Sequence, residues 1–243
     1  MSTPFIVKPE SAAHVVPAAR PSAHYGGEYF HWQSEIGRFG GWANLSKFAP
    51  FVRHNMRVLD FGCGGGYLLY HLDCREKLGI EINPVARDAA ERNSISAVSS
   101  TAEVEDGWAD LIVSNHALEH CEYPLGELRE LFRKVTPGGT VVFFVPSESI
   151  RHRFRKNDPN HHLYSWSPMS AANLFAEAGF RVLESKAYLH VWPPSGLPKL
   201  LRRVGGRFLF ELGCRAYGTL TYLGLSATSV SQIRIIAQRP SAI

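Results

Sequence analysis

The chain has 243 residues, 45% hydrophobic residues and a formal net charge of +4 at pH 7, values typical of a soluble protein long enough to bury a sizeable core. No stretch reaches the roughly 18–20 uninterrupted apolar residues of a membrane span, and the amino-terminal stretch lacks the pattern of a secretory signal. The small net charge does not by itself indicate a nucleic-acid partner. Four cysteines without CxxC spacing argue against a zinc site or a disulfide framework, so we expect a reduced, cytoplasmic protein.

Residues 1–24 are rich in proline, alanine and serine and show no hydrophobic period, which predicts a flexible amino-terminal arm. Residues 28–52 then carry aromatic and aliphatic side chains at helical intervals, interrupted by Gly40 and Gly41. Because glycine is unfavourable inside a helix, we expect a helical segment over 25–52 that is broken at these two residues.

From residue 57 onward, strand and helix patterns alternate. Strands are predicted at 57–62, 77–82, 95–99, 109–115, 139–146, 180–189 and 231–238, and helices at about 65–72, 84–93, 124–135 and 168–178. Short β-branched strands alternating with helices predict an α/β fold with a Rossmann-like, doubly wound, mostly parallel seven-stranded sheet and helices on both faces. Residues 190–230 predict one or two amphipathic helices. We therefore interpret residues 25–243 as a single domain with a helical insertion before its last strand.

A cluster of four glycines follows the first strand in VLDFGCGGGYLLYHL (58–72). Glycine costs folding entropy, so such a cluster needs a backbone or ligand reason. The carboxyl end of a strand is where open α/β sheets bind ligands, and the amides of the next helix point there. Glu81 stands at the end of the second strand, where a carboxylate can accept both hydroxyls of a ribose. The alternative for Glu81 is a helix-capping or surface acid.

The negative charge of Asp60, beside the glycines, indicates which kind of ligand the turn can bind. Gly62, Gly64 and Gly66 are spaced as G-x-G-x-G, and Asp60 precedes the first of them by two residues. An aspartate would repel a pyrophosphate but attract a ligand that carries an ammonium and a sulfonium group. This charge pattern favours S-adenosylmethionine.

Four segments in order resemble the motifs of the class I S-adenosylmethionine-dependent methyltransferases, and the resemblance covers roughly residues 28–189 and the final strand. The segments are VLDFGCGGG, GIEINP, STAEVEDGWADLIVSNHALEH and LRELFRKVTPGGTVVFFVP. The resemblance implies S-adenosyl-L-methionine as cofactor and S-adenosyl-L-homocysteine as product. It further implies that the three glycines lie along the methionine part of the cofactor and that Asp60 supports its amino group. Glu81 would bind the ribose, Ile82 would flank the adenine, and Ala102 and Glu103 would contact the adenine edge. Asn115 and His116 would lie beside the methionine moiety and the transferable methyl group.

The segments HALEH and HHLYSW…LFAEAGF resemble small-molecule methyltransferases, including enzymes of sugar and polysaccharide modification. The expected acceptor is therefore a hydroxyl of a sugar or glycoconjugate. A quinone, a lipid, another secondary metabolite, or a non-catalytic cofactor-binding scaffold remain as alternatives. The motif of amino-group methylation on nucleic-acid bases is replaced by Ser-Asn-His-Ala over 114–117, which argues against a nucleic-acid substrate.

A hydroxyl acceptor calls for a general base that titrates near neutral pH, and histidine is the natural candidate. His161 and His162, in the loop before the helix at 168, and His116 after the fourth strand are the candidates. His116 and His120 are four residues apart, as in some metal sites, but no third ligand is evident, and we expect no metal.

The same segments supply candidates for the acceptor pocket. They are His120, Tyr164 and Trp166, and, if the resemblance extends to a helical lid over the cofactor, Tyr29 and Trp32. For each of these residues the alternative is a packing or capping role.

Basic residues gather in RHRFRK (151–156) and, among apolar residues, in 195–225. These runs are solvated faces or sites for a phosphate-bearing acceptor. Residues 195–225 could also lie on an anionic membrane surface or contact a second copy of the chain. A monomer and a homodimer both remain open.

Overall fold

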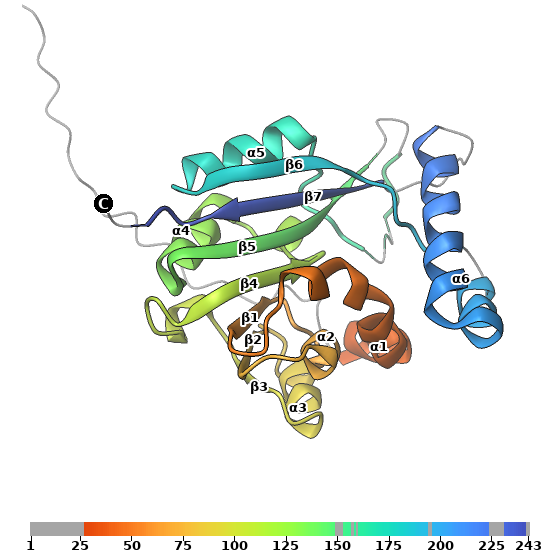
Figure 1. Ribbon diagram of the computed structural model, residues 1–243, viewed down its shortest axis with the longest axis horizontal. Helices are drawn as coiled ribbons and strands as arrows, with labels where there is room; N and C mark the ends of the chain where they lie inside the picture. Colours follow the sequence, from red (N-terminus) through yellow and green to blue (C-terminus); the bar gives the residue numbers. More distant parts are fainter. Residues whose placement is uncertain are drawn as a thin grey trace, which may run out of the picture.

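Seven strands form one sheet in the order β3-β2-β1-β4-β5-β7-β6 (Figure 1). This computed structural model describes residues 27–148, 153–156, 158, 160–193, 196–223 and 231–241, so the predicted arm over 1–24 lies outside the described residues. The strands are β1 (Arg57–Phe61), β2 (Glu76–Ile80), β3 (Ser96–Val98), β4 (Ala109–Asn115), β5 (Val135–Ser147), β6 (Arg181–Tyr188) and β7 (Ser231–Gln238). Only β7 runs antiparallel to its neighbours, β5 and β6. The predicted Rossmann-like, mostly parallel seven-stranded sheet is confirmed.

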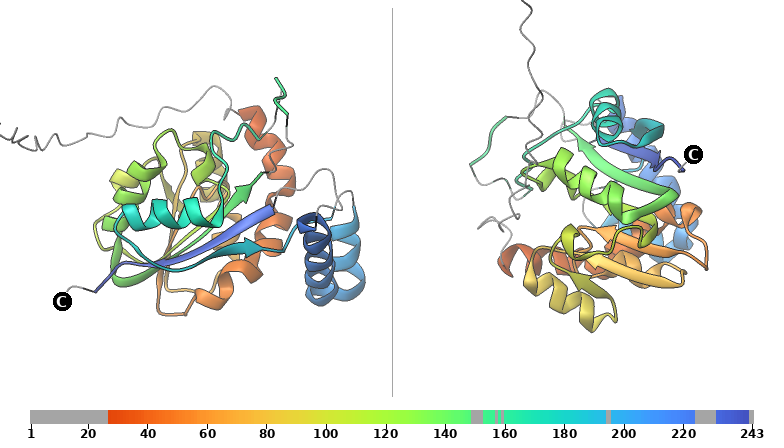
Figure 2. Two further views of the ribbon diagram at one scale, coloured as in Figure 1. Left: turned by 90° about the horizontal axis from the view of Figure 1, so that it is seen from above. Right: turned by 90° about the vertical axis from the view of Figure 1, so that its left-hand side faces the viewer.

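Helices cover both faces of the sheet, as predicted (Figure 2). They are α1 (Gly27–Phe48), α2 (Tyr67–His71), α3 (Pro84–Arg92), α4 (Pro124–Lys134), α5 (Pro168–Glu177) and α6 (Leu197–Tyr222). Successive residues of a strand point to opposite faces. Leu59 accordingly packs in the cluster that includes Leu128 of α4 and Phe175 of α5. Val58 packs in the other cluster, with Phe48 of α1 and residues of α2 and α3.

Helix α1 is continuous through Gly40 and Gly41, so the predicted break is wrong. A Cβ atom at Gly41 would lie 2.5 Å from the carbonyl carbon of Tyr67 in α2. A Cβ atom at Gly37 would overlap the Tyr67 ring. The missing side chains allow α1 to approach α2 closely, and this packing offsets the roughly 1 kcal/mol that each helical glycine costs relative to alanine.

Helix α6 consists of two helical pieces, within the prediction of one or two helices for 190–230. Gly205 and Gly206 have non-helical backbone angles, with φ of +58° at Gly206. The second piece folds back on the first, since a Cβ atom at Gly213 would overlap Leu201 (Figure 2). Phe210 of the second piece is fully buried in a small cluster with residues of α1. The insertion therefore docks on α1.

Most element boundaries differ from the prediction by one or two residues, and two of the differences have a clear structural reason. Strand β5 begins at Val135 instead of 139 because Val135 pairs with Ala109 before the register shifts. Helix α2 is limited to Tyr67–His71 because Gly64 and Gly66 keep a left-handed backbone in the turn before it.

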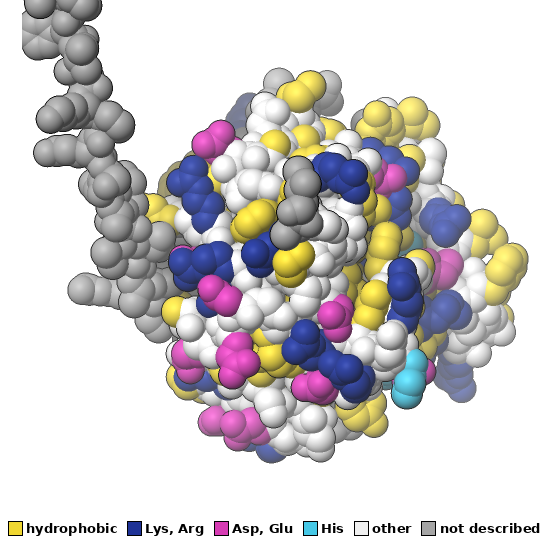
Figure 3. Space-filling model, turned by 60° about the vertical axis from the view of Figure 1, so that its left-hand side comes forward, with side chains coloured by type: hydrophobic (Ala, Val, Ile, Leu, Met, Phe, Trp, Pro, Cys, Tyr) yellow, Lys and Arg dark blue, Asp and Glu magenta, His cyan; other side chains and the backbone are white. Residues whose placement is uncertain are grey.

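The surface carries charges of both signs. On the face shown in Figure 3, lysine and arginine side chains are interspersed with acidic ones. None of the helices in the described part of the chain combines the length and apolar composition needed to cross a membrane.

Candidate active site

The glycine turn after β1 is shaped by three left-handed residues. Gly62, Gly64 and Gly66 have φ of +77°, +53° and +71°, a region that glycine enters without strain. A Cβ atom at Gly66 would lie 2.9 Å from Ile95, and one at Gly62 would overlap Ala117, whereas one at Gly64 would meet nothing within 4 Å. A side chain at Gly62 or Gly66 would therefore clash with a neighbouring residue, whereas Gly64 borders open space that a ligand can fill.

A buried and a half-buried carboxylate, Asp60 and Glu81, flank this turn. Asp60 is 3% exposed on β1. Burial, with a further contribution from the Glu81 carboxylate, raises the pKa of Asp60 to about 7. Glu81 follows β2, and its carboxylate accepts hydrogen bonds from the amides of Gly64 (2.9 Å) and Asn83 (2.8 Å). Burial raises the pKa of Glu81 as well, although these hydrogen bonds oppose the shift. The site thus holds two acids whose ionisation is sensitive to a positively charged ligand.

A pocket of about 410 Å³ opens beside the turn. Five residues predicted to bind the cofactor line it, namely Asp60, Gly62, Gly64, Asn115 and His116. Helix α1 forms one wall through Gly37, Gly40, Gly41, Asn44 and Lys47. The helical segment predicted as a lid therefore borders the pocket. Tyr29 and Trp32 lie on α1, but their side chains are outside the described part of the structure.

The other residues predicted to bind the cofactor are not among those that line this pocket, but they lie along the same carboxyl edge of the sheet: Gly66 (methionine part), Glu81 (ribose), and Ile82, Ala102 and Glu103 (adenine). Gly66 and Ile82 follow β1 and β2, and the Ile82 carbonyl accepts a hydrogen bond from Arg87 at 2.9 Å. Ala102 and Glu103 belong to a 3₁₀ helix, η3 (Thr101–Glu103), after β3. The glycine turn thus follows β1, Glu81 follows β2, and Ala102 and Glu103 follow β3, and these three strands are neighbours in the sheet.

Lys47 is a site residue that sequence reasoning missed. Its side chain is buried, and Nζ donates hydrogen bonds to Asn115 Oδ1 (2.9 Å) and Gln232 Oε1 (2.7 Å). Burial lowers the pKa of Lys47 to about 7, against the opposing influence of Cys214 and Glu211. No local pattern marks this lysine, because its surroundings come from β4, β7 and α6.

The polar contacts continue from Lys47 to the insertion. Gln232 Nε2 donates to the carbonyl oxygen of His190 (3.0 Å), and His190 Nε2 lies 2.9 Å from Glu211 of α6. Arg202 and Arg207 stack over Trp42 of α1 at 4.4 and 4.3 Å from its ring centroid. These two arginines therefore help to dock α6.

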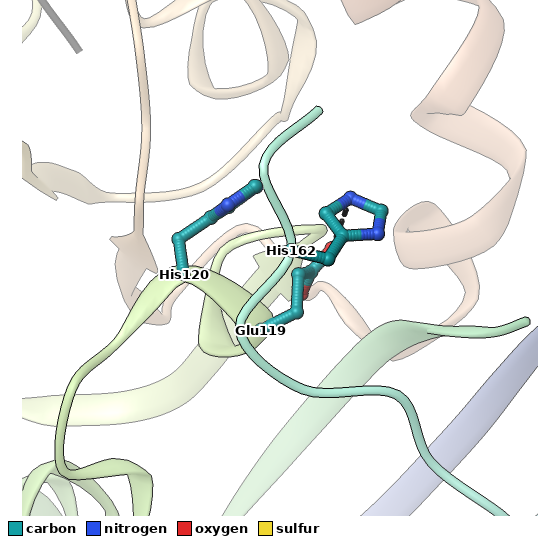
Figure 4. Close-up of side chains that lie close together, drawn as sticks. All are labelled: Glu119, His120 and His162. Carbon is teal, nitrogen blue, oxygen red and sulfur yellow. Dashed lines mark ion pairs between the residues drawn. The ribbon is translucent and has the colours of Figure 1, made fainter. Parts of the chain in front are cut away.

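A histidine–carboxylate cluster adjoins the pocket. Glu119 lies on η4 (Leu118–His120) and is fully buried. Its Oε1 is 3.1 Å from His116 Nδ1. The same oxygen is 3.9 Å from His162 Nε2 (Figure 4). His162 Nδ1 lies 2.7 Å from Glu148 Oε1. The ring centroids of His120 and His162 are 5.1 Å apart. The structure thus gathers three predicted histidines around Glu119, a residue not singled out from sequence although it stands within HALEH.

The backbone holds this cluster together. The carbonyl oxygen of Glu119 accepts hydrogen bonds from the amides of Leu163 (2.9 Å) and Tyr164 (3.3 Å). Burial opposes ionisation of Glu119, but the hydrogen bond from His116 holds its pKa below the usual value. Burial lowers the pKa of His120 to about 4, so this imidazole is neutral at physiological pH.

The other predicted residues of this loop have separate positions. His161 is exposed, and its amide donates to Asp158 Oδ2 at 3.2 Å. Tyr164 donates its hydroxyl to the carbonyl oxygen of Glu122 (3.1 Å) and stacks on Trp166. Trp166 is 9% exposed and packs in the main hydrophobic cluster, which is the packing alternative for this residue.

The family model described as "Methyltransferase domain" matches residues 32–185. An uncharacterized methyltransferase of Mycobacterium tuberculosis is 38% identical over 127 residues, which cover 48% of this chain and 61% of that protein. A ubiquinone biosynthesis O-methyltransferase of Burkholderia vietnamiensis is 31% identical over 108 residues, 39% of this chain and 46% of that protein. A malonyl-[acyl-carrier protein] O-methyltransferase of Salmonella typhimurium is 28% identical over 171 residues, 63% of this chain and 66% of that protein. The chain thus spans less than two thirds of these relatives.

Solved structures share the fold. A chain in the complex of the Haloferax volcanii Trm112 methyltransferase activator with a methyltransferase has a TM-score of 0.62 and 19% identity, covering 88% of this chain and 98% of that chain. The Haemonchus contortus phosphoethanolamine N-methyltransferase 2, solved with phosphomonomethylethanolamine and S-adenosylhomocysteine, has a TM-score of 0.56 and 13% identity, covering 87% and 59%. Since the family model covers more than half of the residues, the chain belongs to the methyltransferase-domain family and to the class I S-adenosylmethionine-dependent methyltransferases.

Proposed function

We propose that the protein is an S-adenosylmethionine-dependent methyltransferase that methylates a hydroxyl of a small acceptor. The observation that carries this proposal is the pocket at the glycine turn, where Asp60 and Glu81 flank an open cradle at Gly64. Two carboxylates suit a ligand with an ammonium group, a sulfonium group and ribose hydroxyls. The residues present therefore fit this cofactor.

Each residue of the turn has a defined task in this proposal. When bound, the cofactor supplies a methyl group that its sulfonium has already activated. Glu81 accepts hydrogen bonds from the ribose hydroxyls, and Asp60 attracts the amino group. The α1 wall excludes water and holds the acceptor close to the pocket, because such a transfer is accelerated mainly by orientation.

His116 is the base that we propose for a hydroxyl acceptor. It lines the pocket, and its Nδ1 is held by Glu119, so the ring is oriented to receive the proton that the hydroxyl loses. His162, the earlier candidate with His161, lies between Glu119 and Glu148 and fits a positioning role. His161 is exposed. Replacing His116 by Asn is expected to lower the rate about 100-fold or more while the cofactor still binds.

A sugar or glycoconjugate remains the acceptor class that we propose, with oxygen as the methylated atom. Two of the relatives named above are O-methyltransferases, which supports oxygen. The polar cluster of Glu119, His120 and His162 beside the pocket supports a hydroxylated acceptor. A cytoplasmic location belongs to the same proposal.

The surface of α6 favours a lipid-bound, quinone or phosphate-bearing acceptor as the second candidate. A surface pocket of about 370 Å³ is lined by Phe39, Lys199, Arg202 and Arg203. Large apolar side chains are exposed on the same helix, namely Leu197, Leu200, Val204, Phe208, Leu212, Leu220 and Tyr222. Basic and apolar side chains together suit peripheral contact with an anionic membrane. Replacing Lys199 and Arg203 by Glu should abolish co-sedimentation with anionic vesicles if this candidate is correct.

The first experiment is calorimetric titration of the full chain with S-adenosylmethionine and S-adenosylhomocysteine, with Glu81→Ala as variant. Glu76→Ala is the matched control, because Glu76 begins the strand that leads to Glu81 but is exposed. Binding that Glu81→Ala weakens and Glu76→Ala does not supports the cofactor site. A screen of sugars, quinols and phosphorylated acceptors for S-adenosylhomocysteine release then separates the acceptor classes. A folded protein that binds neither ligand refutes the proposed function.

A further inference from the structure

Three potential ligand atoms converge beside the methyl-transfer pocket. One atom each from Glu119, His120 and His162 lies within 4.8 Å of the other two. Glu119 and His120 come from η4, whereas His162 comes from the loop before α5 (Figure 4). A carboxylate and two imidazoles are the donor set of several catalytic sites for divalent transition metals.

One atom in this cluster lacks a partner. The Glu119 side chain is fully buried, and its Oε1 faces His116 and His162. Its Oε2, however, has no hydrogen-bond partner among the residues that the structure describes. A buried carboxylate oxygen without a partner is costly, because it has lost its water without replacement. A cation at this position satisfies it.

The two imidazoles are held from behind in the way that metal ligands commonly are. His162 Nδ1 pairs with Glu148 at 2.7 Å, while Nε2 faces Glu119. The His120 ring is hydrogen-bonded to the backbone of His161. Metal-binding histidines typically use one ring nitrogen for such a carboxylate or carbonyl contact, which fixes the tautomer and orients the other nitrogen toward the metal.

We propose that Glu119, His120 and His162 bind one divalent transition-metal ion, with Zn²⁺ as the preferred ion. Bonds of about 2.0–2.1 Å place the ligand atoms of a tetrahedral site roughly 3.4 Å apart, so binding draws the loop at 160–166 slightly toward η4. Three protein ligands leave a position open for an acceptor atom. The sequence analysis expected no metal because no third ligand was evident beside His116 and His120, whereas the structure brings His162, from a distant loop, close to Glu119 and His120.

The role of the ion rests on the proposed function. His116 both lines the pocket and contacts Glu119, so the open position borders the site of methyl transfer. The ion acts as a Lewis acid that lowers the pKa of the acceptor hydroxyl. The hydroxyl proton passes to His116, the acceptor oxygen forms the bond to the methyl carbon, and the sulfur–carbon bond breaks.

The test measures metal binding without methyl transfer. The full chain is treated with a chelator, dialysed and titrated with Zn²⁺ by calorimetry, and the Co²⁺ form is examined by visible absorption spectroscopy. The variants are His120→Asn and His162→Asn. His54→Asn is the matched control, because His54 also pairs with a carboxylate, Asp73 at 3.0 Å, but both side chains are exposed. We expect one equivalent of Zn²⁺, at least 100-fold weaker binding in both variants, and unchanged binding in the control.

Each variant is also titrated with S-adenosylhomocysteine, which reports folding of the pocket separately from the metal. If a histidine variant fails to fold, Glu148→Gln serves instead, with a 10–100-fold loss of Zn²⁺ affinity expected for loss of the contact behind His162. No Zn²⁺ binding to the wild type, or binding that these substitutions leave unchanged, overturns the proposal. Loss of the proposed function would instead appear as failure to bind S-adenosylmethionine and S-adenosylhomocysteine, with Zn²⁺ binding intact.

Discussion

The charge state of Asp60 makes cofactor affinity depend on pH. Burial, with help from Glu81, raises the pKa of Asp60 from its ordinary 3.8 to about 7. Ionising this carboxyl in the free protein therefore costs roughly 4 kcal/mol relative to water, at 1.36 kcal/mol per pKa unit. A ligand with an ammonium group favours the carboxylate and offsets this cost. Binding should accordingly strengthen as the pH rises toward 7.

The assay is calorimetric titration with S-adenosylhomocysteine between pH 5.5 and 7.5. The upper limit stays below the range of about 7.7–8.0 in which an α-amino group titrates. For the wild type we expect the Kd to weaken by up to tenfold for each pH unit below 7, because one proton must leave Asp60. Asp60→Asn should bind more weakly at pH 7.5 and show a nearly flat profile. Glu76→Ala, which changes an exposed acid of the adjacent strand, should retain the wild-type slope.

The free energy of unfolding should respond to pH in the opposite direction to cofactor affinity: it should fall as the pH rises toward 7. Because the pKa of Asp60 is higher in the folded than in the unfolded protein, the folded protein binds more protons between about pH 4 and 7. The Asp60 carboxyl therefore contributes stability at low pH, and this contribution is lost as the pH rises through about 7. Asp60→Asn should therefore be more resistant to urea than the wild type at pH 8, by up to roughly 4 kcal/mol, and similar at pH 4. Equal affinity of the wild type across the pH range, or an unchanged slope in Asp60→Asn, refutes this reasoning.

The remaining predictions concern α1 and the glycine turn. Because burial lowers the pKa of Lys47 in the folded protein to about 7, the unfolded chain binds more protons above pH 7. The free energy of unfolding of the wild type should therefore rise by roughly 2–3 kcal/mol between pH 7 and 9 relative to that of Lys47→Met. Urea unfolding that gives the same pH dependence for both proteins contradicts this prediction. Gly41→Ala should lose about 1–3 kcal/mol of stability, since its Cβ would overlap the backbone of Tyr67, as measured by urea unfolding. Gly64→Ala meets no neighbour within 4 Å, but its φ of +53° should cost roughly 1–2 kcal/mol of stability through backbone strain. The same variant should weaken cofactor binding, so a folded Gly64→Ala protein with wild-type affinity for S-adenosylhomocysteine argues against an open cradle.

Local patterns along the chain were sufficient to predict the sheet and one half of the site. Alternating strand and helix signals determine which face each strand residue buries, as Val58 and Leu59 show by packing on opposite sides. The glycine turn and Glu81 were predictable because each follows its own strand, and neighbouring parallel strands bring their carboxyl ends together. Such features depend on residues close in sequence.

The other half of the site was decided by tertiary structure. Gly40 and Gly41 have a poor intrinsic helix propensity, yet α1 continues through them, and the missing side chain at Gly41 allows the backbone of Tyr67 in α2 to approach closely. Burial lowers the pKa of Lys47, and the residues around this side chain come from β4, β7 and α6, far from α1 in sequence. A buried group takes its electrostatic properties from whatever the fold packs against it, and those neighbours come from distant parts of the chain that only the folded structure brings together.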